Sequence, residues 1–290
     1  MNCYNSSIYL KEAIDSVIDQ TYQNWEIVFW DNQSTDESAS IFNSYKDTRC
    51  KYFYAPQHTS LSTGRNLAVE KANGEIIAFL DCDDIWMPHK LEEQIVPFCK
   101  NDRVGIVYSD FELLLNSSTV SAKKMLSSFS QIRCYPHGPK NIYHTLLRAN
   151  FIIFSTVCIR KSIYTRAGGF TDKFNHNEDY ELLLKCSTLS DAVCTDSKTL
   201  RYRIHGSNNS YANLEIGYLE IRAILNELKN DKWVQKAINV NEARYLVYLF
   251  FKDHKFAHLR ALLHINILKG LTALFARRIY FTLYGINNLN

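Results

Sequence analysis

Apolar and polar segments alternate regularly over the first 110 residues of the chain. Four short segments have the apolar composition of buried strands, at residues 25–30, 50–54, 76–80 and 104–108. The segments between them carry apolar residues at helical spacing. Strands that alternate with helices in this way predict an α/β fold with a doubly wound, mainly parallel, Rossmann-like sheet.

Helix starts are marked by specific residues. Ser34 is expected to begin a helix, because Glu37 three residues later completes a capping box. Three further helices are predicted: one after residues 5–7, one over residues 61–72, and one that Pro88 opens. The first of these is expected to bury the face formed by Ile8, Ala13, Ile14, Val17 and Ile18.

The beginning of the chain departs from this pattern. A doubly wound sheet normally begins with a buried strand, yet Met1 leads almost at once into Asn5. Either the first strand is missing or residues 1–4 are its remnant. We expect the sheet to be less stable than a complete one.

The second half of the chain changes character twice. Residues 111–150 are polar and loop-like, and residues 151–206 return to strand and helix patterns. From Leu214 onward the pattern is helical. We therefore expect a domain over residues 1–210 and a helical C-terminal region over residues 211–290.

Composition excludes several classes of protein. The 33 basic and 30 acidic residues leave a formal charge of +3, which gives no argument for nucleic-acid binding. No run of 18 apolar residues indicates a spanning helix, and no leader precedes Asn5. The eight cysteines form no C-x-x-C pair, which favours the reducing cytoplasm.

The strongest chemical signal is the cluster Asp81-Cys82-Asp83-Asp84 at the end of a predicted strand. Open α/β sheets bind ligands outside the carboxyl ends of their strands. Carboxylates packed this closely repel one another unless a cation lies between them. The cluster predicts a Mg²⁺ or Mn²⁺ site shared with a phosphate, and a solvated acidic turn is the alternative.

Weaker signals follow other predicted elements. Asp31 ends a neighbouring strand, and Arg65 lies near the start of a helix, where a guanidinium suits a diphosphate. Glu178 and Asp179 open a later helix, and His205 ends a strand. For each of these, a structural role such as a helix partner or a core histidine is the alternative.

Taken in order, the motifs resemble the family 2 glycosyltransferases of the GT-A fold. The stretches that carry the resemblance cover residues 1 to about 210 and are Tyr4-Asn5, Trp25-Glu26-Ile27-Val28, Asp31, Ser34-Thr35-Asp36, Gly64-Arg65-Asn66-Leu67-Ala68, Phe79-Leu80-Asp81-Cys82-Asp83-Asp84, Trp86-Met87-Pro88, Lys90-Leu91, Gly168-Gly169-Phe170, Glu178-Asp179-Tyr180-Glu181-Leu182 and Arg203-Ile204-His205.

The resemblance implies a role for each matching residue. The donor nucleotide, expected to be UDP, would be bound by Tyr4, Asp31, Arg65, Asp81 and Cys82. A divalent Mg or Mn ion would be held by Asp83 and His205, and Asp179 would be the general base with Glu178 beside it. The implied reaction is an inverting transfer of a sugar from a nucleotide-sugar donor to a saccharide or lipid-linked saccharide, in the synthesis of cell-surface polysaccharide or glycolipid.

Two departures from the family pattern stand out. The family usually has a strand and a proline before the Tyr-Asn pair, and Asn32 here replaces a frequent second Asp. Asn32 can still hydrogen-bond the ribose, so it does not argue against activity. The short start leaves open an alternative function, that of a non-catalytic relative that binds nucleotide sugars or carbohydrates. Turnover of a nucleotide sugar would separate an enzyme from a binding module.

The last 39 residues mix large apolar residues with six basic side chains and a single acidic one. An amphipathic basic helix of this kind would adsorb to anionic lipid at the inner face of the plasma membrane. A helical cap on the catalytic domain, or a dimer contact, is the alternative.

Overall fold

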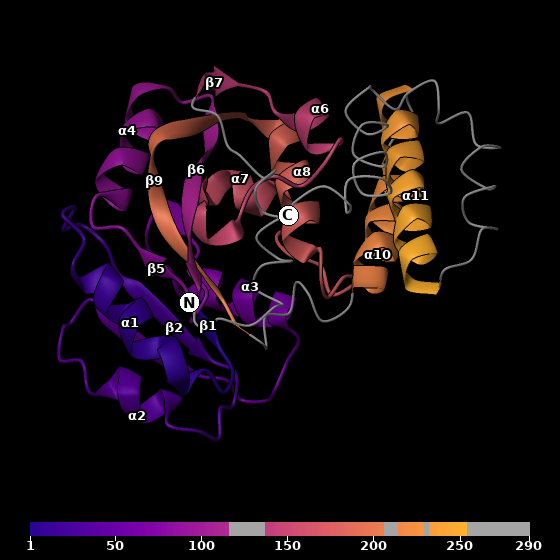
Figure 1. Cartoon of the computed structure of the whole chain (residues 1–290). Coiled ribbons are helices and arrows are strands. Elements are labelled where there is room, and N and C mark those ends of the chain that lie inside the picture. Colours follow the sequence, from indigo (N-terminus) through magenta and orange to yellow (C-terminus); the bar gives the residue numbers. More distant parts are fainter. Residues whose placement is uncertain (116–136, 206–213, 229–231, 254–290) are drawn as a thin grey trace, which may run out of the picture. The chain divides into compact units, whose positions relative to one another are not determined.

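The computed structural model describes residues 1–115, 137–205, 214–228 and 232–253. The chain divides into two compact units, Met1–Asn208 and Asn209–Asn290 (Figure 1). The first unit combines strands with helices and the second is helical in its described part. The predicted α/β class is therefore confirmed.

Two sheets form the framework of the first unit. The strands of the first sheet are parallel throughout and lie in the order β1 (Asn2–Cys3), β2 (Ile27–Asp31) and β3 (Cys50–Tyr54). The second sheet is mixed. It runs in the order β4 (Ile76–Ala78), β8 (Cys158–Arg160), β6 (Val104–Leu115), β9 (Asp191–Ile204) and β5 (Ile85–Trp86), with β7 (His137–Lys140) on β9.

Strands β6 and β9 lie side by side and in parallel, as the long neighbouring ribbons of Figure 1 show. The pairs β4–β8, β6–β8, β5–β9 and β7–β9 are antiparallel. The long β6–β9 pair extends well beyond the predicted strand over residues 104–108. The predicted loop over residues 111–150 is therefore wrong where β6 continues and where β7 and α6 (Tyr143–Leu146) form, and residues 116–136 lie outside the described part.

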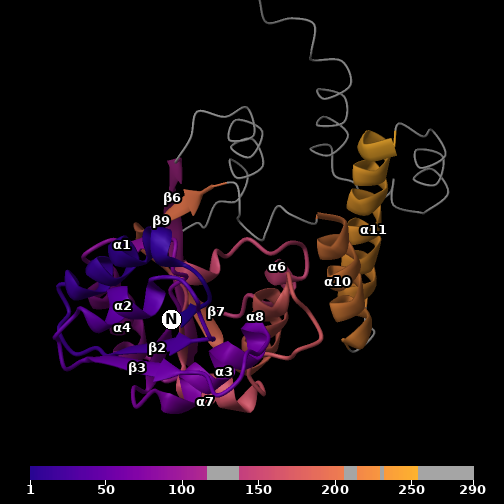
Figure 2. The ribbon, with the colours of Figure 1, turned by 90° about the horizontal axis from the view of Figure 1, so that it is seen from below.

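Helices cover both sheets of the first unit (Figure 2). Those that follow strands of the parallel sheet are α1 (Ser7–Ile18), α2 (Ser38–Asn43) and α3 (Leu61–Lys71). The others are α4 (Lys90–Lys100), α7 (Lys161–Arg166) and α8 (Glu178–Leu189), with a 3₁₀ turn η1 at Phe154–Thr156. All five residues of β2 are buried, as expected for a strand covered on both faces.

Two helix predictions need correction. Helix α1 buries Leu10, Ala13, Ile14 and Val17, whereas Ile8 is 81% exposed, because it lies on the outer side of the first turn. Ser34 does not begin a helix, since α2 starts only at Ser38 and has no side-chain cap.

The short strand β1 pairs in parallel with β2, with Asn2 opposite Trp30. Two of the first four residues therefore form a strand at the edge of the parallel sheet. Gly64 of α3 lies close against this strand, because a Cβ at that position would come within 2.8 Å of the Asn2 Oδ1.

The second unit contains the helices α10 (Leu214–Glu227) and α11 (Lys232–Asp253). They pack antiparallel, since Glu215 pairs with Lys252 at 2.5 Å and Arg222 with Glu242 at 3.4 Å. Within the described ranges, no helix has both the length and the apolar character needed to cross a membrane.

Candidate active site

The acidic cluster lies where β4 runs out, as the sequence predicts. The Asp81 and Asp83 side chains are 45% and 30% exposed, while Asp84 is buried. Burial raises the pKa of Asp83 and of Asp84, and the charge of Asp81 raises both further. The cluster is therefore short of positive charge, as a cation site would be.

Asp83 and His205 meet across the site. The His205 Nε2 lies 2.9 Å from the Asp83 Oδ2, although 122 residues separate them. Arg203, two residues before His205 on β9, holds the segment in place, since its Nε donates to the Asp83 carbonyl oxygen at 2.8 Å. Its backbone N–H donates to the Asp84 Oδ1 at 3.0 Å. These bonds fix the acidic cluster against the end of β9.

The donor atoms of this pair suit a divalent cation. A carboxylate oxygen is a normal ligand of Mg²⁺ and Mn²⁺, and the imidazole nitrogen of His205 favours a transition ion such as Mn²⁺. No group of three or more His, Cys, Asp or Glu side chains with metal-binding geometry exists in the part of the chain that the structure describes. Asp83 and His205 are therefore two candidate ligands and not a complete set of metal ligands among the described residues.

Arg65 connects the acidic cluster to the start of α8. Its Nη2 donates to the Asp81 Oδ1 at 2.8 Å and its Nη1 donates to the Glu178 Oε1 at 2.7 Å. The guanidinium is nearly buried, so these charge-assisted bonds form away from bulk water. Helix α3 begins with Ser60 as its N-cap, which places Arg65 inside the helix and not at its free N-terminus.

Asp179 lies next to Glu178 in the first turn of α8 and is partly exposed. Its recessed position, together with the negative charge of Glu178, raises the pKa of Asp179 to about 7, although Arg65 opposes the shift. The charge of Asp81 also contributes to this shift. Arg65 binds both Asp81 and Glu178, the residue before Asp179, so the acidic cluster and the start of α8 lie close together.

The Gly168-Gly169-Phe170 turn packs against α3 near the acidic residues 81–84. Gly168 and Gly169 have φ angles of +86° and +65°, which glycine adopts without strain. The turn lets Phe170 exchange two hydrogen bonds with the Asn66 side chain, through its N–H at 3.0 Å and its carbonyl oxygen at 2.9 Å. The Phe170 ring centroid also lies 5.4 Å from the Arg65 Cζ, so the turn contacts the guanidinium as well.

The expected nucleotide-base residues differ in their accessibility. The Tyr4 side chain is exposed, and its ring centroid lies 4.5 Å from that of His58. Asp31 is fully buried, and its oxygens accept hydrogen bonds from the Ser34 N–H at 2.7 Å and the Tyr52 hydroxyl at 2.6 Å. In this state Asp31 shapes the loop after β2 and does not face solvent.

Cys82 is also buried, and its thiol donates to the Asn2 carbonyl oxygen at 3.4 Å. Any contribution of Cys82 to nucleotide binding would therefore come from its backbone.

Two residues near the site were not assigned a role from the sequence. His58 follows the carboxyl end of β3, at the same sheet edge as Asp31, and the strand-end rule alone points to it. Arg203 lies near the end of β9, which stops at Ile204, and His205 follows directly. The proximity of Arg203 to His205 in the sequence is the signal that could have indicated Arg203.

Comparison with known proteins places these features in a family. The family model described as glycosyl transferase family 2 matches residues 1–144. The Escherichia coli UDP-Glc:alpha-D-GlcNAc-diphosphoundecaprenol beta-1,3-glucosyltransferase WfgD is 32% identical over 197 residues, which cover 67% of this chain and 72% of that protein. A second Escherichia coli protein of the same printed activity, WfaP, is 27% identical over 86% of this chain and 88% of its own.

Solved structures share the fold at low sequence identity. Staphylococcus aureus TarS 1–349 in complex with UDP-GlcNAc superposes with a TM-score of 0.64 at 15% identity, covering 91% of this chain and 77% of that one. The mannosyltransferase PcManGT from Pyrobaculum calidifontis, in complex with GDP-Man and Mn²⁺, gives a TM-score of 0.60 at 15% identity over 97% and 81% of the two chains. With its GT-A fold and these relatives, the chain belongs to glycosyl transferase family 2 and is a glycosyltransferase.

Proposed function

We propose that this glycosyltransferase moves a sugar from a UDP-sugar donor to a hydroxyl group of a saccharide acceptor, with inversion at the anomeric carbon. The observation that carries the proposal is the convergence on Asp81. Asp81 lies two residues before Asp83, which contacts His205, and it accepts a hydrogen bond from Arg65, which also binds Glu178 beside Asp179. The Asp83–His205 pair and Arg65 suit a diphosphate, and Asp179 suits an incoming alcohol.

Asp179 has the properties of a general base. A pKa of about 7 leaves a large fraction of Asp179 unprotonated at neutral pH, and a well-placed general base contributes roughly 10²–10⁴-fold to a rate. Asp179 would accept the proton of the acceptor hydroxyl as the oxygen attacks. A single displacement of this kind needs one carboxylate on the attacking side and inverts the anomeric centre.

Asp83 and His205 would hold a divalent cation, with Mn²⁺ favoured by the imidazole nitrogen. When bound, such an ion neutralises charge that develops on a diphosphate leaving group. Arg203 keeps Asp83 and His205 in register for this task.

The remaining donor contacts follow from exposure. Asp81 has an accessible carboxylate and suits the ribose hydroxyls, while Tyr4 and His58 form an aromatic wall that suits a uracil ring. Arg65 would add fixed positive potential beneath the diphosphate. Asp31 would reach the base only after a change of its bonds to Ser34 and Tyr52.

We further propose that the acceptor is lipid-linked. The relatives WfgD and WfaP are named for a diphosphoundecaprenol substrate, and the basic, apolar sequence of residues 252–290 suits contact with an anionic membrane. The amphipathic helix was predicted within residues 252–290, of which residues 254–290 lie outside the described part of the chain. A membrane contact of this kind would bring the enzyme to an acceptor held in the bilayer.

Asp179→Asn tests the proposed function. The variant is expected to bind UDP with Mn²⁺ as the parent does, measured by thermal shift beside GDP and dTDP, while sugar transfer falls by roughly 10²–10⁴-fold. Asp102→Asn is the matched control, because the Asp102 side chain is fully exposed. Normal turnover in Asp179→Asn would remove this residue from the reaction, and equal responses to all nucleotides would refute the UDP assignment.

A further inference from the structure

The acidic cluster begins just beyond the paired part of β4 and β8. In their antiparallel register, Ala78 lies opposite Cys158. The Phe79 N–H extends the ladder by one step, because it donates to the Val157 carbonyl oxygen at 3.3 Å. Every second residue of an antiparallel strand makes such a bond, so the next N–H that points toward the β8 side belongs to Asp81.

Ser155 binds this N–H with its side chain. A regular ladder would pair the Asp81 N–H with the Ser155 carbonyl oxygen, since residues 79 and 157 lie opposite each other. Instead, the Asp81 N–H donates to the Ser155 Oγ at 3.2 Å, and the Ser155 carbonyl oxygen accepts from the Trp86 Nε1 at 2.9 Å. The hydroxyl therefore takes the place of a backbone carbonyl at the point where η1 replaces the strand.

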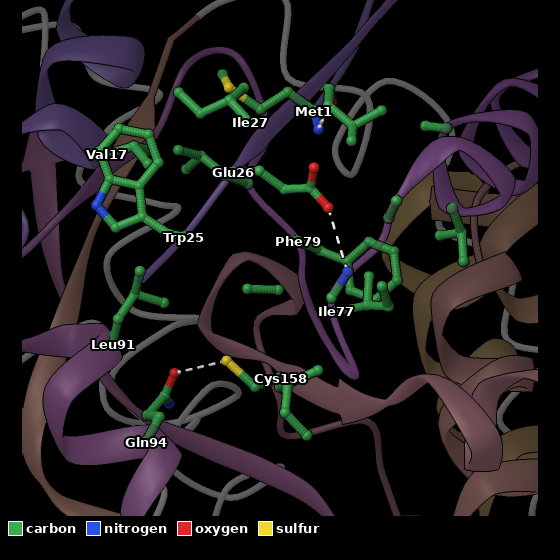
Figure 3. A pocket seen from close by; sticks show the side chains of 18 of the residues that line it. Met1, Val17, Trp25, Glu26, Ile27, Ile77, Phe79, Leu91, Gln94 and Cys158 are labelled. Atoms are coloured by element: carbon green, nitrogen blue, oxygen red, sulfur yellow. Dashed lines mark hydrogen bonds between the residues drawn. The ribbon is translucent and has the colours of Figure 1, made fainter. Parts of the chain in front are cut away.

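Helix α4 holds η1 in place through a buried polar network. The Lys90 Nζ and the Gln94 Nε2 both donate to the Thr156 carbonyl oxygen at 2.9 Å. The Gln94 Oε1 accepts from the Cys158 thiol at 3.2 Å, and Figure 3 shows this contact between α4 and β8. Lys90, Gln94 and Thr156 are fully buried. The network therefore fixes the backbone of η1, which carries Ser155.

The bond to Ser155 fixes the main chain of a residue whose side chain reaches the site. The Asp81 side chain is 45% exposed, whereas Ser155 is buried. The Asp81 Oδ1 accepts from the Arg65 Nη2 at 2.8 Å, and the Asp81 carbonyl oxygen accepts from the Asp84 N–H at 3.3 Å. A shift of the Asp81 main chain would therefore displace both the ion pair with Arg65 and the turn that carries the acidic cluster.

We propose that Ser155 is a positioning residue of the transfer reaction, whose hydroxyl sets the place of Asp81 and thereby the affinity for the nucleotide part of the donor. This role depends on the proposed binding of the donor ribose by Asp81. Without the hydroxyl, the Asp81 N–H loses its acceptor, which favours a shifted main chain. The ribose is remote from the bond that breaks, so donor binding depends on Ser155 more than the chemical step does.

Ser155→Ala and Ser16→Ala form a matched pair of variants. In each parent residue, a buried serine hydroxyl accepts a main-chain N–H from a distant segment, that of Asp81 at 3.2 Å for Ser155 and that of Trp86 at 3.1 Å for Ser16. The two variants should therefore lower the Tm by similar amounts. They should differ in donor binding, because only Ser155 contacts Asp81.

Ser155→Ala should raise the KM for UDP-glucose and the Kd for UDP with Mn²⁺ about tenfold, while the kcat for UDP-glucose turnover changes less than about threefold. Ser16→Ala should leave all three within about twofold of the parent. An equal rise of KM in both variants would overturn the positioning role. So would a lower kcat with an unchanged KM in Ser155→Ala, because a merely structural defect reduces the active fraction.

Hydrogen exchange provides a measurement without nucleotide. The Asp81 amide of the parent should be protected by at least about tenfold relative to an unstructured chain, and Ser155→Ala should lose this protection while Ser16→Ala keeps it. An unprotected Asp81 amide in the parent would overturn the proposal. If the parent does not bind UDP, the proposed donor is wrong and the role of Ser155 falls with it. If the parent and Ser155→Ala bind UDP equally, only the role of Ser155 falls.

Discussion

Arg203 contacts several parts of the candidate site, although no role was assigned to it from the sequence. Its guanidinium donates to the Asp83 carbonyl oxygen and pairs with Glu12 at 2.9 Å, and it lies 4.4 Å from the centre of the Tyr9 ring. Its side chain is only 4% exposed. Arg203 therefore acts as a positioning residue for Asp83 and His205.

Arg203→Met should lower the free energy of unfolding by about 2 kcal/mol. The substitution removes the hydrogen bond to the Asp83 carbonyl oxygen and the contact of the guanidinium with the Tyr9 ring. The Mn²⁺ concentration for half-maximal transfer should rise about tenfold, because the ligand pair loses its support. Urea unfolding and metal titration measure the two effects. Arg201→Met is the matched control on the same strand, with a half-exposed side chain 3.8 Å from Glu112, and should change stability by less than about 0.5 kcal/mol. Equal losses in both variants would contradict the positioning role.

The raised pKa of Asp179 predicts a pH profile. A general base acts in its unprotonated form, so kcat should rise about tenfold per pH unit below about 7 and level off above it. Glu178→Gln removes a negative neighbour that raises this pKa, so the inflection should move to lower pH even if the rate falls. Transfer rates at saturating donor and acceptor between pH 5 and 9 would measure both profiles. An unchanged inflection in Glu178→Gln would assign the titration to another group.

At the residue scale, the family resemblance assigned Asp83 and His205 to one metal site, and the structure places the two side chains in contact. The metal role itself stays a prediction. The closure of Asp31 by the Tyr52 hydroxyl was not predictable, because a tyrosine on the next strand carries no local signal. The same holds for the bond of Arg65 to Glu178, which joins residues 113 positions apart.

Among the elements, the Gly168-Gly169 turn is the most constrained connection. A Cβ at Gly169 would lie 2.8 Å from the Asn66 Oδ1, whereas a Cβ at Gly168 would meet no atom within 4 Å. Both residues have positive φ. The pair therefore separates the cost of backbone strain from the cost of a steric clash.

Gly168→Ala should lower the free energy of unfolding by about 1–2 kcal/mol through strain alone. Gly169→Ala should cost about 1 kcal/mol more and should also slow transfer, because it displaces Asn66 beside Arg65. Gly138→Ala, with neither a positive φ nor a close neighbour, should be nearly neutral. Denaturant unfolding and a transfer assay compare the three. Identical stabilities for the two turn variants would show that Asn66 moves freely.

Helix starts in this chain depend on contacts that the local sequence does not reveal. The Asp36 carboxylate accepts hydrogen bonds from the N–H of Ser7, at the start of α1, and from that of Ser38, at the start of α2. Burial alone would raise the pKa of Asp36, yet these bonds outweigh it and lower the pKa to about 2. The predicted capping box at Ser34 is wrong, because Asp36 instead accepts the N–H of Ser38 at the start of α2. The same carboxylate also binds the N–H of Ser7, 29 positions earlier in the chain, which no local pattern reveals.

For the whole molecule, the pattern of strands and helices was sufficient to predict the α/β class but not the second sheet. The strands β1 to β3 follow the rule that joins parallel strands through helices. The antiparallel partners β8, β5 and β7 pair across long stretches of chain, which leaves no periodic signal in the sequence. Strand β9 pairs with β5 and β6, which come from distant parts of the chain. This pairing brings His205, just after β9, beside the acidic cluster.

The proposed membrane contact is a property of the whole chain and depends on charge. Replacing Lys269, Arg277 and Arg278 with Gln should weaken binding to anionic vesicles about 10²-fold, since each basic residue near such a surface contributes about 1 kcal/mol. Flotation of the full chain with anionic and with zwitterionic vesicles measures this. The control replaces three exposed lysines of the first unit, Lys46, Lys100 and Lys140, and should retain binding. Because the attraction is electrostatic, salt should release the parent from vesicles at concentrations where the Debye length falls to a few ångströms. If the parent and the triple variant float equally well with anionic and with zwitterionic vesicles, residues 252–290 do not bind the membrane through their charge. That result would favour a protein contact for residues 252–290.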